Sequence, residues 1–323
     1  MPATSRVVLT TSEASDLFEG IDRGSVEALG SLEGCPLILV DDPGPHSGLT
    51  VPPLLPSVTV ALGPHGAGLD VAAGSDGDLA RIEQQVHAFP TASVTLVQVL
   101  RAGSASIEHD LLTESLAYSS LRAGPEHARW RRDRPPVARR PDPGPAVTTS
   151  RHGATLTITL DRPHVRNAYS ASMRDGLCAA LAEACGDAGV QVVELRGRGP
   201  AFCSGGDLDE FGTGPDAPTA HIIRTARSAA RLLGRLGPRT VAHLHGACIG
   251  AGIELPALAG RVLADRDTYM ALPEVGMGLI PGAGGTASIP RRIGRERTAW
   301  MALTARPVDA ATALAWGLVD QIV

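Results

Sequence analysis

The stretch "ACIGAGIELPALAGRVLADRDTYMALPEVGMGLIPGAGG", from Ala247 to Gly285, carries two glutamates in surroundings built mainly of Gly, Ala, Leu and Pro. Glu254 and Glu274 stand twenty residues apart, and each lies beside glycine-rich turns. An ionised carboxylate in an apolar environment is costly unless it is paired or hydrogen-bonded. The pattern therefore raises the hypothesis that both acids serve a site among these turns.

Two glycine turns offer groups that could work with such acids. The turns "SGGD" (204–207) and "GAGIE" (250–254) each follow a predicted strand and open a predicted helix. A helix start leaves backbone N–H groups without partners and favours negative charge nearby. Two such groups aimed at one carbonyl oxygen would stabilise charge that develops there, and nearby carboxylates could move protons at the adjacent carbon. A structural alternative stays open, in which the glycines serve tight turns and Glu254 caps its helix.

The composition narrows the classes of function. The chain has 323 residues, 43% of them hydrophobic, and a formal net charge of −5. Such a length favours two globular domains. All 29 basic residues are arginine, so "PGAGGT" at 281–286 cannot be a P-loop, and Schiff-base chemistry on lysine is excluded. We expect neither nucleic acid nor a membrane as a partner, because the sequence has no long basic patch and no apolar run of bilayer length.

The potential metal ligands form no recognisable motif. The five cysteines include no CxxC pair, and their odd number is typical of reduced thiols, so we expect a cytoplasmic protein. His243 and His245 share one face of a predicted strand. No third ligand follows at a readable spacing, so we interpret them as packing residues and expect no metal site.

The first part of the chain, residues 1–130, is predicted to form an α/β extension of mixed strands and helices. Runs of β-branched residues indicate the strands, and apolar spacing of three and four residues indicates the helices. His109 and Glu114, on the second of these helices, are interpreted as surface residues. The predicted elements are strands at 37–41, 57–62 and 93–100, helices at 76–89 and 105–122, and a further helical turn at "PEHARWRR".

Residues 131–148, "RRDRPPVARRPDPGPAVT", predict an extended and solvated linker because prolines and arginines dominate. From 149 to 323, strands alternate with helices at a spacing typical of an α/β layered domain. The predicted elements are strands at 154–160, 190–197, 240–250 and 261–265 and at "TYMALPE", with helices at 170–187 and 218–235 and another beginning at "IELPALAG".

The second part of the chain resembles the crotonase (enoyl-CoA hydratase/isomerase) superfamily over residues 154–322. For residues from about 150 to 323, the resemblance implies a crotonase-like spiral of ββα units. It also implies an acyl-CoA thioester substrate and no cofactor other than the coenzyme A of that substrate. The matching segments, in the family's order and spacing, are "LDRPHVRNAYSASM" (160–173), "AFCSGGDLDEF" (201–211), "HGACIGAGIELPALAGRVLA" (245–264), "LPEVGMGLIPGAGGTASIPRRIG" (272–294) and "GLVDQIV" (317–323).

The resemblance also implies roles for single residues. Gly206 and Ala251 would supply the two amides of an oxyanion hole, and Glu254 and Glu274 fall where hydratases of the family keep two catalytic acids. Retention of both acids favours hydration of an enoyl-CoA across C2=C3. The alternatives are enoyl-CoA isomerisation, a cofactor-free dioxygenase reaction on an aryl-acetyl-CoA, and a non-catalytic acyl-CoA-binding partner subunit. The expected contacts to CoA come from Arg166, Ala168, Cys203, Ser204 and Asp207.

Family members normally continue beyond the segment at 317–323 with helices that cover the acyl pocket and build a trimer. The segment 111–136 resembles that usual C-terminal part. We therefore expect the helix at 105–122 to supply the cover, with Trp130 as an anchor, either in its own chain or in a neighbouring subunit. The expected assembly is a homo-oligomer, a trimer or a dimer of trimers. The apolar stripe of this helix consists of Ile107, Leu111, Tyr118 and Leu121.

Overall fold

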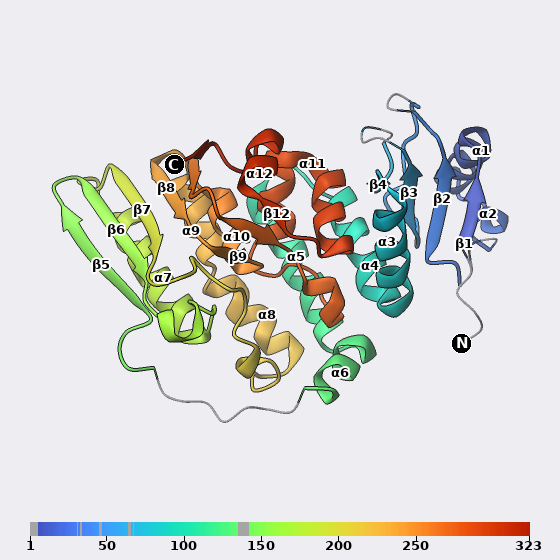
Figure 1. Cartoon of the computed structure of the whole chain (residues 1–323). Coiled ribbons are helices and arrows are strands. Elements are labelled where there is room, and N and C mark those ends of the chain that lie inside the picture. Colours follow the sequence, from blue (N-terminus) through green and yellow to red (C-terminus); the bar gives the residue numbers. More distant parts are fainter. Residues whose placement is uncertain are drawn as a thin grey trace.

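Figure 1 shows the computed structural model of the chain, with a small sheet at one end, a larger sheet at the other and helices between them. The structure describes residues 6–30, 32, 34–44, 47–63, 66, 68–134 and 142–323. No helix within these ranges is long and apolar enough to span a bilayer.

The N-terminal sheet is parallel throughout, and its strands follow the order β1-β2-β3-β4. Alternate residues of a strand face opposite sides of the sheet. Ile38 and Val40 of β2 pack in one cluster with Phe18 of α1, whereas Leu37 and Leu39 face α3 and α4. Burial on both faces explains the continuous apolar runs of these strands. The elements are β1 (Arg6–Leu9), α1 (Thr11–Asp22), α2 (Val26–Gly30), β2 (Leu37–Asp41), β3 (Val58–Leu62), β4 (Val71–Ala73), α3 (Asp76–Ala88) and α4 (Pro90–Arg101).

A buried ion pair ties helix α4 to this sheet. Arg101 Nε donates to Asp70 Oδ1 at 2.8 Å, and Arg101 Nη2 donates to Asp70 Oδ2. The two side chains are 1% and 2% exposed. Arg101 also donates to the carbonyl oxygens of Leu55 and Ser57 at 2.8 and 2.7 Å. The charges are thus fully hydrogen-bonded, as burial requires.

The strand predicted at 93–100 is wrong, because these residues form part of helix α4. Pro90 stands in the first turn, where its missing N–H is not needed. Ala92, Leu96 and Leu100 recur at four-residue steps and are buried, and their helix α4 packs against α11. The β-branched residues of the segment favour a strand, but the helical spacing of its buried apolar residues favours a helix and decides its structure. The strands predicted at 37–41 and 57–62 and the helices predicted at 76–89 and 105–122 are confirmed, whereas β1, α1, α2 and β4 are elements that the sequence did not predict.

The second part of the chain is built around a six-stranded sheet in the order β13-β10-β8-β7-β6-β5. Only the pair β5–β6 is antiparallel within this sheet. A second sheet has three strands in the order β12-β11-β9, and β9 ends directly before the glycine turn at 250–254. The strands are β5 (Val147–His152), β6 (Thr155–Leu160), β7 (Val192–Gly197), β8 (Thr240–Leu244), β9 (Ala247–Ile249), β10 (Arg261–Ala264), β11 (Tyr269–Ala271), β12 (Val308–Asp309) and β13 (Gln321–Ile322).

The helices of this part confirm most of the predicted pattern. Ser170 caps α7, accepting a hydrogen bond from Met173 N at 3.2 Å. The helix predicted at 218–235 is two helices, because the chain leaves the helical conformation at Arg227 and Ser228, and Ser228 caps the second one. The helices are α7 (Ala171–Gly186), α8 (Ala217–Ala226), α9 (Ala229–Leu236), α10 (Ala251–Glu254), α11 (Gly285–Thr304) and α12 (Ala310–Trp316), with 3₁₀ turns η1 (Pro163–Val165), η2 (Leu208–Glu210), η3 (Gly237–Arg239), η4 (Pro256–Leu258) and η5 (Glu274–Met277).

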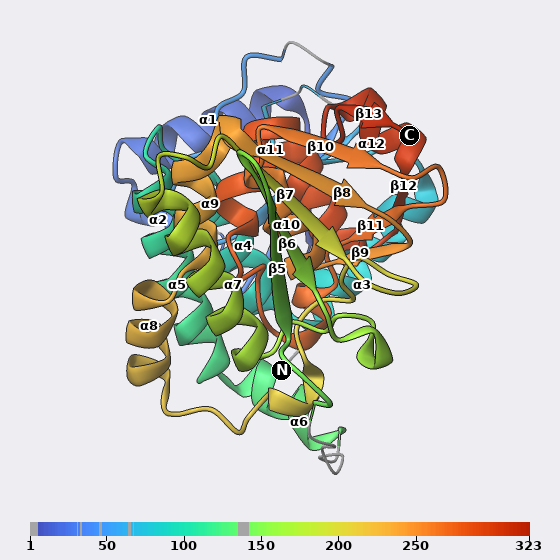
Figure 2. The same ribbon diagram turned by 90° about the vertical axis from the view of Figure 1, so that its left-hand side faces the viewer.

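Two helices of the N-terminal part reach into the second part. Helix α5 (Ile107–Arg122) packs against α8, α9 and α11, and α6 (Pro125–Arg132) packs against η5. Both views place α5 beside α8 (Figures 1 and 2). On α6, Trp130 stacks on His127 and meets Phe211 edge-on, with ring centroids 5.5 and 5.9 Å away. That these helices stand in for the family's C-terminal cover stays a prediction. Residues 135–141 of the predicted linker lie outside the described residues.

Candidate active site

The two glycine turns meet back to back. Ile249 N donates to Cys203 O at 3.0 Å, which joins the segment before one turn to the segment before the other. A Cβ atom on Gly252 would lie 2.3 Å from Cys203 O. Gly205 has a φ of +94°, and a Cβ there would lie 3.1 Å from Ile249 O. Only glycine allows this approach, because a side chain would collide with the opposing backbone.

The amides of Gly206 and Ala251 lie between backbone groups that are already paired. Tyr169 N donates to Gly205 O at 2.7 Å, and Asp207 N donates to Tyr169 O at 3.0 Å. Gly250 N donates to Ala271 O at 2.9 Å. Within the part of the chain that the structure describes, neither the Gly206 amide nor the Ala251 amide donates a hydrogen bond. Both residues line one cavity.

Glu254 and Glu274 flank the same point beside Gly250. A Cβ on Gly250 would lie 2.3 Å from Glu274 Oε1 and 3.6 Å from Glu254 Oε1. Glu254 is only 2% exposed, and its Oε2 accepts hydrogen bonds from Ala283 N at 2.7 Å and Gly285 N at 2.9 Å. Glu274 Oε2 is buried and accepts no hydrogen bond from a described residue. Glu254 is therefore fixed by its surroundings, and Glu274 is left with an unused oxygen.

A third carboxylate, Glu114 of α5, belongs to this site. Its interpretation as a surface residue is wrong: the side chain is 2% exposed. Glu114 Oε1 accepts from Gly284 N at 2.7 Å, and Oε2 accepts from Thr286 N at 2.9 Å and Thr286 Oγ1 at 2.7 Å. The amides at 283–286 thus alternate between Glu254 and Glu114. The sequence offers one indication that Glu114 is buried, because Glu114 lies on the same helix face as the apolar residues Leu111 and Tyr118.

Burial raises the pKa of all three carboxyl groups. The pKa of Glu114 is raised to about 7 and that of Glu274 to about 8, in both cases chiefly because water is excluded. Burial also raises the pKa of Glu254 well above its usual range, and the charges of Glu274 and Glu114 add to this shift. Hydrogen bonds act in the opposite direction: those from Ala283 and Gly285 lower the pKa of Glu254, and those from Gly284 and Thr286 lower the pKa of Glu114. Like charges cannot all persist in one buried cluster, so it retains protons near neutral pH.

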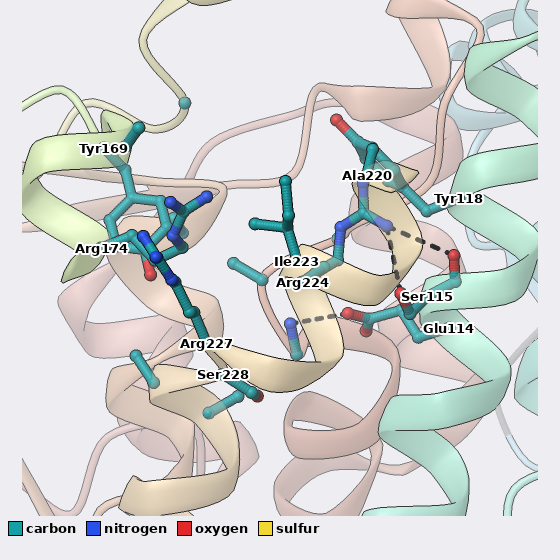
Figure 3. Close-up of a pocket in the computed structure, with 18 of the residues that line it drawn as sticks. Glu114, Ser115, Tyr118, Tyr169, Arg174, Ala220, Ile223, Arg224, Arg227 and Ser228 are labelled. Carbon is teal, nitrogen blue, oxygen red and sulfur yellow. Dashed lines mark hydrogen bonds between the residues drawn. The ribbon is translucent and has the colours of Figure 1, made fainter. Parts of the chain in front are cut away.

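These acids and amides open into a cavity of about 700 Å³. Its walls come from α5, the start of α7, the turns at 206–215, helix α8 and the start of α9 (Figure 3). The cavity is lined on one side by Gly206, Ala251, Glu254 and Glu274, and on another by side chains of α5 that include Glu114 and Tyr118. Residues from both parts of the chain therefore share one site.

The predicted CoA contacts lie near one another, but only Asp207 lines this cavity. Ser204 N donates to Arg166 O at 3.0 Å, and the Arg166 side chain is exposed. Ala168 O accepts from Arg162 Nη1 at 2.6 Å, and the same Arg162 atom donates to Asp207 Oδ2 at 2.9 Å. Cys203 is buried, and burial raises the pKa of its thiol to about 12. The Cys203 side chain is thus enclosed by protein, whereas Arg166 is accessible.

The two histidines of β8 and its end make separate contacts. His243 Nε2 lies 3.7 Å from Glu194 Oε1, and His245 Nε2 lies 2.9 Å from Gly199 O. No group of three or more His, Cys, Asp or Glu side chains suited to a metal ion occurs among the described residues.

Residues 150–323 match the sequence profile of the enoyl-CoA hydratase/isomerase family, so the chain belongs to that family. The predicted crotonase membership and fold class are thereby confirmed, and the solved structures agree. A Mycobacterium smegmatis enoyl-CoA hydratase structure is 31% identical, with a TM-score of 0.51, and the match covers 56% of this chain and 70% of that one.

Two relatives show the range of the family. The 2,3-dehydroadipyl-CoA hydratase of Escherichia coli is 33% identical over 54% of this chain and 68% of its own length. An enoyl-CoA isomerase/hydratase of Mycosarcoma maydis is 32% identical over 51% of this chain. The chain spans only 64% of the length of that second relative. These likenesses show a crotonase-type family, and they do not separate hydratases from isomerases.

Proposed function

We propose that this protein is an enoyl-CoA hydratase, which adds water across C2=C3 of an enoyl-CoA thioester. One observation carries the proposal: Glu254 and Glu274 flank a single point in a cavity that Gly206 and Ala251 also line, and the amides of these two residues donate to no described residue. A hydratase needs these parts, an anion-stabilising pair of donors and two groups that exchange protons.

The two amides would bind the thioester carbonyl oxygen. Addition of water at C3 pushes the C2=C3 electron pair toward this oxygen, which becomes an enolate oxygen. The N–H groups of Gly206 and Ala251 are held by the glycine-packed turns, so they need no rearrangement as the charge forms. Each donor of this kind typically contributes about 10²–10³ in rate.

The two glutamates would divide the proton transfers. Burial raises the pKa of both carboxyl groups, so the pair retains a proton, and the amides of Ala283 and Gly285 favour the remaining negative charge on Glu254. We therefore assign Glu254 as the base that holds the water. Glu274, with its pKa raised to about 8 by burial, would carry a proton at neutral pH. The water oxygen bonds to C3, its proton passes to Glu254, and Glu274 gives its proton to C2. Proton return from Glu254 to Glu274 completes the cycle without any cofactor beyond the CoA of the substrate.

The remaining parts of the proposal concern binding and assembly. Arg166 is exposed on the loop beside the site, where a guanidinium could pair with a CoA phosphate. A related Thermobifida fusca protein, 29% identical with a TM-score of 0.50, was crystallised in complex with CoA, and the match covers 55% of this chain and 72% of that one. We also expect the homo-oligomer of the family, a trimer or a dimer of trimers.

The test is turnover of crotonyl-CoA by the full chain, followed through the loss of enoyl thioester absorbance. Glu254→Gln and Glu274→Gln should each lower turnover by about 10²- to 10⁴-fold, the scale of general acid–base catalysis. Glu183→Gln, an exposed position on α7, is the matched control and should turn over normally. Near-normal turnover by either site variant would overturn that residue's role, and a double-bond shift without water uptake would make the protein an isomerase.

A further inference from the structure

The cavity has a basic wall for which hydration chemistry has no use. Part of this wall comes from helices α7, α8 and α9 and from the turn between α8 and α9, and part comes from α5. The arginines that line the cavity are Arg122, Arg174, Arg224, Arg227 and Arg231.

Only some of these guanidinium groups are neutralised. Arg174 and Arg227 both pair with Asp175, at 2.8 and 2.6 Å. For Arg122, Arg224 and Arg231, no carboxylate of a described residue lies within the 4.0 Å of an ion pair. A cavity wall whose positive charge is not paired by a described carboxylate favours an anionic ligand.

Arg224 is the best placed of the unpaired arginines. Its Nη1 donates to Ser115 Oγ at 3.1 Å (Figure 3). The same atom donates to Ser119 Oγ at 3.0 Å, so the guanidinium is fixed against α5. Its Nε and Nη2 groups make no hydrogen bond to any described residue. Burial lowers the pKa of Arg224; Tyr118 and Glu114 act against this shift, and the charges of Arg122 and Arg174 add to it. The Nε and Nη2 donors of the planar guanidinium are thus available to a ligand, with Arg122 and Arg174 nearby.

Tyr118 connects this basic wall to the acids. The Arg224 guanidinium lies 4.4 Å from the centroid of the Tyr118 ring. The ring also packs on Gly282, where a Cβ would lie 2.3 Å from Tyr118 Cδ2. Burial raises the pKa of Tyr118 to about 12, so the hydroxyl stays a donor. Its hydroxyl hydrogen-bonds to no side chain or backbone group in the described ranges.

We propose that the cavity takes an acyl-CoA whose acyl group ends in a carboxylate, bound by the free N–H groups of Arg224, with Tyr118 and Arg122 beside it. The proposal rests on the hydratase function for the orientation of the thioester at Gly206 and Ala251. The glutamate cluster would repel a terminal carboxylate, and the arginines would attract it. The far end of the acyl chain would therefore point toward α8, while C2 and C3 stay beside the glutamates.

Binding of two unreactive ligands tests this without any turnover. Adipyl-CoA and hexanoyl-CoA have six-carbon acyl groups and differ only in their ends, a carboxylate and a methyl group. We expect calorimetry to show adipyl-CoA binding about 10- to 100-fold more tightly to the wild-type chain, the scale of a charge-assisted hydrogen bond. Arg224→Gln should remove most of that preference and leave hexanoyl-CoA binding unchanged. Arg235→Gln, an exposed arginine of α9, is the control.

The outcomes separate the possible readings. Equal affinity of the wild-type chain for both ligands would overturn the proposal. A loss in Arg224→Gln that is the same for adipyl-CoA, hexanoyl-CoA and CoA would also overturn it, because Arg224 would then bind a CoA phosphate. If Arg224→Gln does not fold, Tyr118→Phe provides the second variant, and an unchanged preference there would contradict the role of the hydroxyl. If the chain prefers adipyl-CoA over hexanoyl-CoA but hydrates no enoyl-CoA, the proposed hydratase function is wrong and the proposed carboxylate site is supported.

Discussion

The carboxylate of Glu114 offers the sharpest perturbation of the site, because it reaches the catalytic loop from the other part of the chain. Glu114→Gln keeps the size of the side chain and removes one acceptor. The three donors at Gly284 N, Thr286 N and Thr286 Oγ1 then face one carbonyl oxygen and one NH₂ group. At least one buried N–H loses its partner, so we expect about 1–3 kcal/mol of lost stability.

The same change should move the pH dependence of catalysis. The charge of Glu114 raises the pKa of Glu254 and Glu274, so its removal should lower both and shift the acid limb of the pH–rate profile to lower pH. Turnover should fall as well, since the loop at 283–286 also holds Glu254. Urea unfolding and a pH series of crotonyl-CoA turnover measure both effects. Glu108→Gln, an exposed position on α5, is the control. A Glu114→Gln protein with wild-type stability and an unshifted pH profile would refute the reasoning.

Three further predictions address the oxyanion donor, the buried charges and the acids. Ala251→Pro removes one amide N–H at a helix start, where proline is tolerated, so turnover should fall about 10²- to 10³-fold. Ala251→Ser keeps the amide and should stay active. Equal activity of the two variants would contradict the role of the Ala251 amide as a donor. Arg101→Met leaves Asp70 buried without its partner and should lower the free energy of unfolding in urea by about 3–5 kcal/mol. The control Arg6→Met, at a half-exposed ion pair, should lower it by about 1 kcal/mol or less. Equal losses in the two variants would contradict this prediction. Burial raises the pKa of Glu274 from 4.5 to about 8. The contribution of protonated Glu274 to the free energy of unfolding is therefore complete below pH 4.5 and is lost as the pH rises through 8. The melting temperature should therefore fall between pH 5 and pH 8, and less so in Glu274→Gln.

The sequence predicted the parts of the site that local chemistry controls. Gly205 and Gly252 stand where only a missing side chain allows two backbones to meet, and such turns are readable from glycine spacing. Glu254 and Glu274 were recognisable because acids are rare in so apolar a stretch. These features need no knowledge of distant contacts.

The contributions of the N-terminal part were not predictable in the same way. Glu114 is buried only because the amides of Gly284 and Thr286, some 170 residues later in the chain, meet it. A glutamate on a helix is ordinarily a surface residue, and nothing in the local pattern contradicts that reading. The helix at Pro90–Arg101 was mistaken for a strand for a related reason. Its β-branched residues favour a strand locally, and packing against α11 decides for the helix.

The most direct test of the hydratase assignment is isotope incorporation from water into crotonyl-CoA. With the full chain in deuterated, heavy-oxygen water, mass spectrometry should find a hydroxyacyl-CoA with heavy oxygen at C3 and one deuterium at C2. Glu254→Gln and Glu274→Gln should leave the crotonyl-CoA unlabelled over the same time. Recovery of unhydrated crotonyl-CoA from the wild-type protein, or of an isomer of unchanged oxygen content, would contradict the assignment.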